Sequence, residues 1–212
     1  MKEFDFSCVK SYRLADVMKP LFKFLSHVMM KVNYIGLDNI PDSGGYILAS
    51  NHISAPDPAY IYIKLNKPIH YMNKQEHFTK PFLSWLYTHF NSFPVNRGHA
   101  DKTSVEYAIK VIEHGDVLGI FPEGTRSKDY TPKQAKTGVA LIARETKANI
   151  LPVSIYSEDK AKFFTKITIR FGEIIPFESL GFSEGGKSDE LRTAAKLIMG
   201  EIIKLWEEKH CK

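Results

Sequence analysis

Tyr46-Ile47-Leu48-Ala49-Ser50 is the stretch of the sequence that decides the fold, and it directly follows a turn sequence at residues 41–45. A continuous apolar run of this length, bounded by a turn, predicts a strand that is buried on both faces. Val117–Phe121 and Ile150–Tyr156 have the same character. Strands of this kind occur in parallel sheets that carry helices on both sides. The sequence therefore predicts an α/β protein.

Segments with helical spacing alternate with strands along the chain. Further strands are predicted at His70–Met72, Ser92–Val95 and Ile167–Phe171. Helices are predicted at Tyr60–Leu65, Pro81–Phe90, Val105–Ile112, Val139–Ala143 and Leu191–Trp206. Strands alternating with helices predict a mainly parallel, mixed sheet flanked by helices. Residues 41–212 are assigned to this single domain.

The N-terminal segment, residues 1–40, has a different pattern. Apolar residues from Leu14 to Met29 recur at helical spacing and lysines occupy the opposite side, which predicts an amphipathic helix. Pro20 lies inside the pattern, so we expect two short helices or one kinked helix. The segment either packs on the core or lies in a membrane interface with its lysines near anionic headgroups. In both cases it belongs to the same structural unit as residues 41–212.

The composition narrows the classes of partner. The 212 residues are 43% hydrophobic and 25% charged, which is typical of one globular domain. The net charge of +5 favours an anionic partner, such as nucleic acid, an anionic membrane surface or a phosphorylated substrate. Because the basic residues form no Lys/Arg block, we expect no nucleic-acid binding. We also expect neither a signal peptide nor a transmembrane helix, since no run of ~18 apolar residues occurs.

The two cysteines, Cys8 and Cys211, lie near opposite ends of the sequence. Their spacing does not match a disulfide framework or a structural zinc site. This usage favours a reducing cytoplasm over secretion. His70 and His77 also lack a partner pattern for metal binding, so we expect packed or surface histidines and no metal site.

Asn51-His52-Ile53-Ser54-Ala55-Pro56-Asp57 lies just beyond the strand at 46–50 and before a predicted helix, where open α/β sheets place ligand sites. His52 is suited to take a proton from an alcohol near neutral pH. Asp57 is placed to bond the other ring nitrogen and to stabilise the imidazolium. A structural alternative is a helix start, in which Ser54 and Asp57 form a pattern like a capping box.

Phe121-Pro122-Glu123-Gly124-Thr125-Arg126-Ser127 also follows a predicted buried strand. Arg126 is suited to grip a phosphate through its bidentate fork, and loop amides add neutral donors. Glu123 cannot bind phosphate directly, but it can orient an arginine or accept from a substrate hydroxyl. Arg97 follows the strand at 92–95; alone it is a typical surface charge, whereas together with Arg126 it predicts a dianion site.

With these features in view, the chain resembles the lysophosphatidic acid acyltransferases, the family of 1-acylglycerol-3-phosphate acyltransferases. The four family motifs match in order at Asn51–Asp57, Phe93–Arg97, Phe121–Ser127 and Leu151–Val153, and Lys136–Gly138 resembles the helix start after the third motif. Asn91 departs from the glycine that often opens the second motif. The departure leaves the conformation of that loop open.

The resemblance implies transfer of an acyl group from acyl-CoA or acyl carrier protein to the sn-2 hydroxyl of lysophosphatidic acid, without a cofactor. It implies that His52 and Asp57 form the general base, with no covalent intermediate. The residues implied in phosphate binding are Arg97, Glu123, Gly124, Thr125 and Arg126. Supporting roles are implied for Asn51, Ser127, Lys136 and Pro152. The implied location is peripheral, on the cytoplasmic face of a membrane.

Three alternatives remain open at this point. A sister acyltransferase would act on another lysolipid or on glycerol 3-phosphate. A peripheral module would bind phospholipid without turnover. Within the enzyme class, Ser54 is a candidate nucleophile for an acyl-enzyme, although the sequence has no Gly-x-Ser-x-Gly elbow.

Overall fold

The computed structural model describes residues 4–28, 30–96, 101–158, 164–183 and 188–211. Within these residues seven strands form one sheet in the order β1-β7-β6-β2-β5-β3-β4. All neighbouring strands are parallel except β6 and β7, which are antiparallel. The strands are β1 Lys31–Ile35, β2 Ile47–Ser50, β3 Ile69–Lys74, β4 Ser92–Val95, β5 Val117–Ile120, β6 Ile150–Tyr156 and β7 Lys166–Phe171. The predicted single α/β domain with a mainly parallel, mixed sheet is confirmed.

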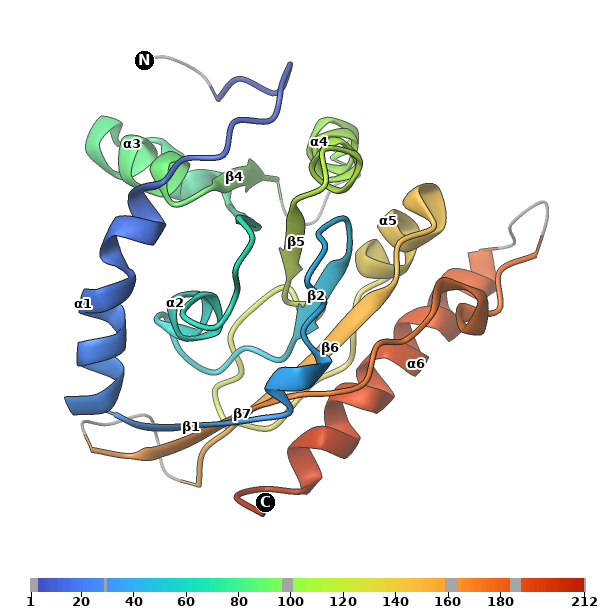
Figure 1. The fold of residues 1–212 in the computed structure, drawn as a ribbon. Coiled ribbons are helices and arrows are strands. Elements are labelled where there is room, and N and C mark those ends of the chain that lie inside the picture. Colours follow the sequence, from blue (N-terminus) through green and yellow to red (C-terminus); the bar gives the residue numbers. More distant parts are fainter. Residues whose placement is uncertain (1–3, 29, 97–100, 159–163, 184–187, 212) are drawn as a thin grey trace.

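Helices cover both faces of this sheet. Figure 1 shows α4, α5 and α6 on one side and α1 and α2 on the other. The α-helices are α1 Leu14–Val28, α2 Asp57–Tyr62, α3 Pro81–His89, α4 Lys102–Glu113, α5 Gly138–Thr146 and α6 Ser188–Glu207. The 3-10 helices are η1 Leu37–Asn39, η2 Gln75–Phe78 and η3 Phe177–Leu180. No helix in the described parts of the chain is both long enough and apolar enough to cross a membrane.

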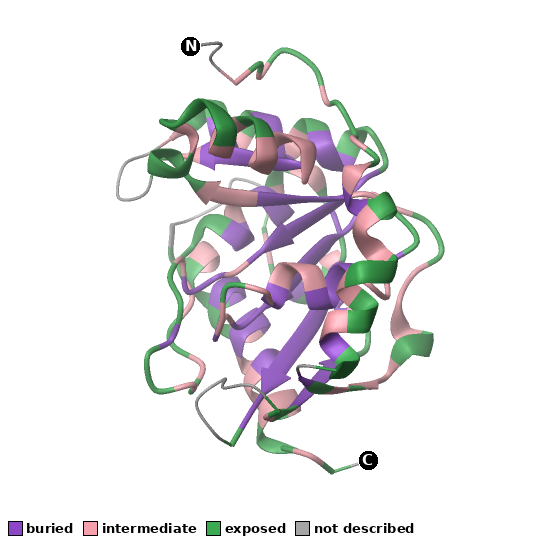
Figure 2. Cartoon of the chain, turned by 90° about the vertical axis from the view of Figure 1, so that its left-hand side faces the viewer, coloured by how far each residue is buried: buried purple, intermediate pink, exposed green. Residues whose placement is uncertain are grey.

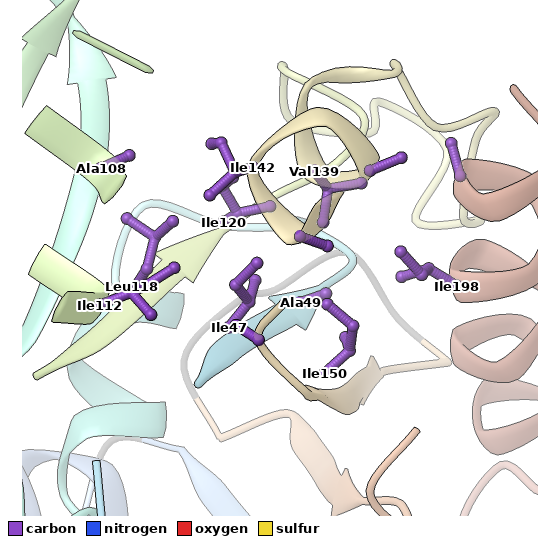
Figure 3. Close-up of a cluster of buried hydrophobic side chains, with 14 of the residues drawn as sticks. Ile47, Ala49, Ala108, Ile112, Leu118, Ile120, Val139, Ile142, Ile150 and Ile198 are labelled. Atoms are coloured by element: carbon purple, nitrogen blue, oxygen red, sulfur yellow. The ribbon is translucent and has the colours of Figure 1, made fainter. Parts of the chain in front are cut away.

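The two faces of β2 explain why its sequence is apolar throughout. Ile47 and Ala49 pack against α4, α5 and α6 in one buried cluster (Figure 3). Leu48 lies on the opposite face, in the cluster formed with α1 and α2. The central strands are buried along their lengths, as the purple arrows of Figure 2 show. Burial on both faces removes the alternation of polar and apolar residues that marks a half-exposed strand.

The N-terminal segment differs from expectation in one respect. Residues 1–40 were predicted to be helical, but Lys31–Ile35 form strand β1 at the edge of the sheet, paired with β7. The side chains of β1 are only partly buried, and polar residues interrupt its apolar residues, so no continuous apolar run marks it. The predicted helix is confirmed as one helix, α1, which contains Pro20, rather than two short helices.

Candidate active site

His52 follows the carboxyl end of β2, and its ring is held by Asp57 at the start of α2. The Nδ1 atom of His52 lies 2.8 Å from Oδ2 of Asp57. The Asp57 side chain is fully buried and also accepts bonds from the backbone N–H groups of Ile53 and Ser54, at 2.8 Å each, and from the Ser54 hydroxyl. The structure therefore agrees with both interpretations of the motif: Asp57 stabilises the start of α2 and it also orients the ring of His52.

The loop after β5 fixes His52 from the other side. The backbone N–H of His52 donates to Oε1 of Glu123 at 3.0 Å, and the backbone N–H of Ser127 donates to the His52 carbonyl at 2.8 Å. The imidazole stacks on the ring of Phe121, with ring centres 4.0 Å apart and an interplanar angle of 16°. Tyr71 stacks behind Phe121 at 5.6 Å. Backbone and ring are thus both constrained, which leaves the imidazole little freedom to rotate.

Asn51 ties the end of β2 to β6 through its side chain. Its amide Nδ2 donates to the Ile155 carbonyl at 2.9 Å, and the Ile155 N–H donates to Oδ1 at 2.7 Å. The side chain replaces a peptide group and extends the pairing of the two strands by one residue. Pro152 lies in β6 opposite Ala49, and its carbonyl accepts from Gly172 N–H at 2.8 Å. Asn51 directly follows β2 and Pro152 lies in β6, and neither residue lines the cavity beside His52.

Gly124 allows the loop after β5 to turn tightly beneath Lys136. Its φ of 70° lies in the left-handed region, and a Cβ at this position would lie 3.0 Å from the Lys136 side chain. The backbone N–H of Lys136 donates to the Pro122 carbonyl at 2.9 Å. Thr125 and Arg126, next in the loop, are exposed. The loop therefore presents a hydroxyl and a guanidinium at the surface, while the hydrogen bond between Lys136 and Pro122 fixes its backbone.

A cavity of about 640 Å³ opens beside His52 and is called the His52 cavity below. Its polar lining includes His52, Thr125, Arg126 and Lys74. The apolar part of its lining is contributed by α1, α2, β3 and the end of α3, and includes Ala15, Phe22, Ala59, Ile69, Tyr87 and Phe90. Nε2 of His52 has no hydrogen-bond partner among the described residues. The cavity thus joins a candidate base, cationic side chains and an apolar wall suited to a lipid chain.

Glu123 lies beneath His52 rather than in the lining of the cavity. Its residue is 4% exposed, and its Oε2 atom is buried without a hydrogen-bond partner in the described structure. Burial raises the pKa of its carboxyl group from 4.5 to about 7. Its contact with the His52 backbone indicates a positioning role. A contribution to phosphate binding stays a prediction.

Lys74 and His77 are cavity residues that sequence reasoning missed. Lys74 ends β3, at the same edge of the sheet as His52, so the rule that selected Arg97 and Arg126 also applies to it. His77 follows in η2, with Nδ1 at 2.8 Å from Oδ1 of Asn73. Arg97 itself lies outside the described residues. Within the described residues, no group of three or more His, Cys, Asp or Glu side chains could hold a metal ion.

Comparison with known proteins identifies the family. Residues 31–156 match the family model described as Acyltransferase. The chain belongs to the acyltransferase family. This acyltransferase-family chain is 30% identical over 126 residues to the 1-acyl-sn-glycerol-3-phosphate acyltransferase of Bacillus subtilis, covering 59% of the chain and 62% of that relative. It is 28% identical over 182 residues to the enzyme of the same name from Streptococcus pneumoniae, covering 83% and 66%.

A solved structure extends the likeness to nearly the whole fold. The 1-acyl-sn-glycerophosphate (LPA) acyltransferase PlsC from Thermotoga maritima matches with a TM-score of 0.73 and 25% identity, over 94% of this chain and 80% of that one. The predicted resemblance to this family is therefore confirmed. The acyltransferase-family chain spans just under two thirds of the length of the two bacterial relatives.

Proposed function

We propose that this chain transfers a fatty acyl group to the sn-2 hydroxyl of 1-acylglycerol 3-phosphate and produces phosphatidic acid. The observation that carries the proposal is the His52–Asp57 pair, whose 2.8 Å contact uses Nδ1 and leaves Nε2 for a substrate in the cavity. The relatives that bear this enzyme name support the same reaction class.

In the proposed reaction, Nε2 of His52 takes the proton of the sn-2 hydroxyl as its oxygen attacks the thioester carbonyl. The tetrahedral intermediate then breaks its C–S bond, and the thiolate leaves with the proton returned by His52. Asp57 stabilises the imidazolium between these steps. General base catalysis of this kind contributes typically ~10²–10⁴-fold to the rate. The Ser54 hydroxyl already donates to Asp57, which favours this direct transfer over an acyl-enzyme on Ser54.

The acceptor phosphate is assigned to the cationic end of the cavity. Arg126 supplies the bidentate fork, Thr125 a hydroxyl and Lys74 a point charge. Arg97 is proposed as a further contact. The 1-acyl chain occupies the apolar wall lined by Phe22 and other residues. The thioester donor is acyl-CoA or acyl carrier protein, and the reaction requires no cofactor.

An enzyme that acts on a lipid acceptor must contact a membrane surface, and α1 has exposed apolar and basic side chains suited to this contact. Val17 is 73% exposed and Phe24 is 61% exposed, although both are large apolar residues. Lys23 is exposed next to Phe24. This combination is typical of helices that lie in the interface of an anionic bilayer. We therefore propose a peripheral location on a membrane surface, and the cysteine usage of the sequence favours the cytoplasmic face.

A panel of donors and acceptors tests the proposal, with release of the free thiol as the readout. Purified protein is given palmitoyl-CoA or palmitoyl-acyl carrier protein with 1-acylglycerol 3-phosphate, a lysophosphatidylcholine or glycerol 3-phosphate. We expect the fastest release with 1-acylglycerol 3-phosphate. A faster reaction with another acceptor would indicate a sister acyltransferase. Binding to anionic liposomes without thiol release would indicate a phospholipid-binding module.

Flotation with anionic liposomes tests the role of α1. If Phe24→Glu floats with the liposomes as well as the wild-type protein does, α1 does not make the membrane contact.

A further inference from the structure

A second cavity of about 620 Å³ lies on the other side of α3 from the His52 cavity. It is bounded by residues 4–12, which precede α1, and is called the N-terminal cavity below. Its other walls come from β3, η2, α3, α4, the turn after α3 and the start of β4. Lys110 of α4 donates to the carbonyls of Phe6 and Ser7, and the Ser11 hydroxyl donates to Asp116, so residues 4–12 are attached to the domain at these two places.

Asn91 joins the turn after α3 to the N-terminal residues. Its Oδ1 atom accepts from the backbone N–H of Tyr12 at 2.7 Å, and its Nδ2 atom donates to the Tyr12 carbonyl at 3.2 Å. Its φ of 54° lies in the left-handed region, which asparagine tolerates and glycine adopts freely. Glycine would hold the same backbone but could not form the two bonds. The residue that departs from the family pattern therefore makes a contact of its own, the Asn91–Tyr12 bridge.

The bridge lies on the wall between the two cavities. Phe90 lines the His52 cavity, Asn91 lines the N-terminal cavity and Ser92 lines both. The N-terminal residues follow the same order, since Tyr12 lines the N-terminal cavity and Ala15 lines the His52 cavity. Residues 90–92 and residues 12–15 thus each run from the lining of one cavity to the lining of the other, and the Asn91–Tyr12 bridge joins the two segments at this boundary.

The lining of the N-terminal cavity favours a hydrocarbon chain over a polar ligand. Several of its polar side chains already have partners: Lys10 lies 2.9 Å from Asp5, and His70 lies 3.1 Å from Asp116. Much of the remaining surface is aromatic and includes Phe4, Phe78, Trp85 and Tyr107. An alkyl chain would pack against these rings without giving up hydration, whereas a polar ligand would have to give up water to lie against them.

We infer that Asn91 is a specificity-determining residue: its bridge to Tyr12 ends the space available to an acyl chain in the His52 cavity. The N-terminal cavity beyond the bridge is a second segment of the acyl-chain site, and it becomes accessible when the bridge is removed. Joining the two volumes, about 640 and 620 Å³, would roughly double the space. The inference rests on the proposed function only in placing an acyl chain beside His52.

Chain binding can be measured separately from acyl transfer. A fluorescent fatty acid is bound to purified protein and displaced by laurate, palmitate or arachidate. Asn91→Gly keeps the left-handed backbone and removes the bridge. We expect it to raise the affinity for arachidate relative to palmitate by at least about tenfold, because a single extra methylene that a pocket accepts already contributes about that much. Asn91→Asp keeps one acceptor but repels the Tyr12 carbonyl, so an intermediate shift is expected.

Lys110→Ala is the matched control, because it frees residues 6 and 7 and leaves the bridge intact. It should keep the wild-type order of affinities. The inference is overturned if Asn91→Gly, or Asn91→Asp where the glycine variant does not fold, leaves the ratio unchanged. It is also overturned if Lys110→Ala shifts the ratio equally. If the wild-type protein does not transfer acyl groups but Asn91→Gly still shifts the affinity ratio, the proposed function is refuted and this inference stands.

Discussion

Among the described residues, the partly buried pair His52–Asp57 and the buried pair His70–Asp116 differ in which ring nitrogen contacts the carboxylate. His52 contacts Asp57 through Nδ1 at 2.8 Å, which leaves Nε2 without a partner in the described residues. His70 contacts Asp116 through Nε2 at 3.1 Å, and the same nitrogen lies 3.2 Å from the Ser11 hydroxyl. The comparison teaches that the residue types do not define a catalytic pair. What distinguishes His52 is that it lines a cavity together with the cationic side chains of Lys74 and Arg126, whereas His70 lines the N-terminal cavity with several aromatic side chains.

The two pairs also lie at opposite ends of the parallel strands. His52 follows the carboxyl end of β2, the edge where open α/β sheets bind ligands. His70 lies near the amino end of β3, and Asp116 directly precedes β5. Asp116 also accepts from the Ser11 hydroxyl at 2.5 Å, which attaches the N-terminal residues to the domain. The second pair is therefore structural.

The largest expected difference between the two pairs appears when their aspartates are replaced. Asp57→Asn should lower kcat by about 10⁴-fold, as loss of the orienting carboxylate does in other His–Asp systems, because the wrong tautomer of His52 is favoured. Asp116→Asn should leave kcat near that of wild type and lower the melting temperature. The measurement is kcat for acyl transfer alongside thermal unfolding of both variants. Equal losses of kcat would remove the distinction between the pairs.

Arg126→Lys should have a smaller effect, mainly on the acceptor. The substitution keeps the charge and removes the bidentate fork, so KM for 1-acylglycerol 3-phosphate should rise about tenfold with a smaller change in kcat. Arg144→Lys is the control, since Arg144 lies on α5 outside the His52 cavity and pairs with Glu145. A KM for Arg126→Lys that matches this control would argue against phosphate binding by Arg126.

The smallest expected effect concerns the pH dependence of stability. Burial raises the pKa of Glu123 from 4.5 to about 7, so the folded state favours the protonated carboxyl group. Its contribution to stability is full below about pH 4.5 and is lost as the pH rises through about 7. Glu123→Gln mimics the protonated group and retains an acceptor for the His52 N–H. Its melting temperature relative to wild type should therefore increase from about pH 5 to about pH 8. A constant difference across this range would contradict an ionisable, buried Glu123.

Local patterns were sufficient to predict most of the fold and the centre of the candidate site. The strands β2, β5 and β6 are apolar runs, and His52 and Asp57 are close in sequence, so their pairing needs only one tight turn. Strand β1 was missed because polar residues interrupt its apolar residues, its side chains are partly exposed, and it pairs with β7, which is distant in sequence.

The contacts that the sequence does not indicate are those between side chains and distant backbone. Asn51 bonds to Ile155 in β6, and Asn91 bonds to Tyr12 before α1. An asparagine has no pattern that names its backbone partner, so such contacts become visible only in the folded chain. The positioning of His52 by Glu123 is of the same kind, because it depends on where two strands end in space.

The most direct test of the central claim is kcat for acyl transfer in His52→Ala and His70→Ala, measured side by side below both melting temperatures. The account predicts that His52→Ala loses about 10²–10⁴-fold or more in kcat with little change in unfolding temperature. It predicts that His70→Ala unfolds at a lower temperature but keeps the wild-type kcat. Wild-type acyl transfer by His52→Ala, or an equal loss in His70→Ala, would contradict the assignment of His52 as the general base.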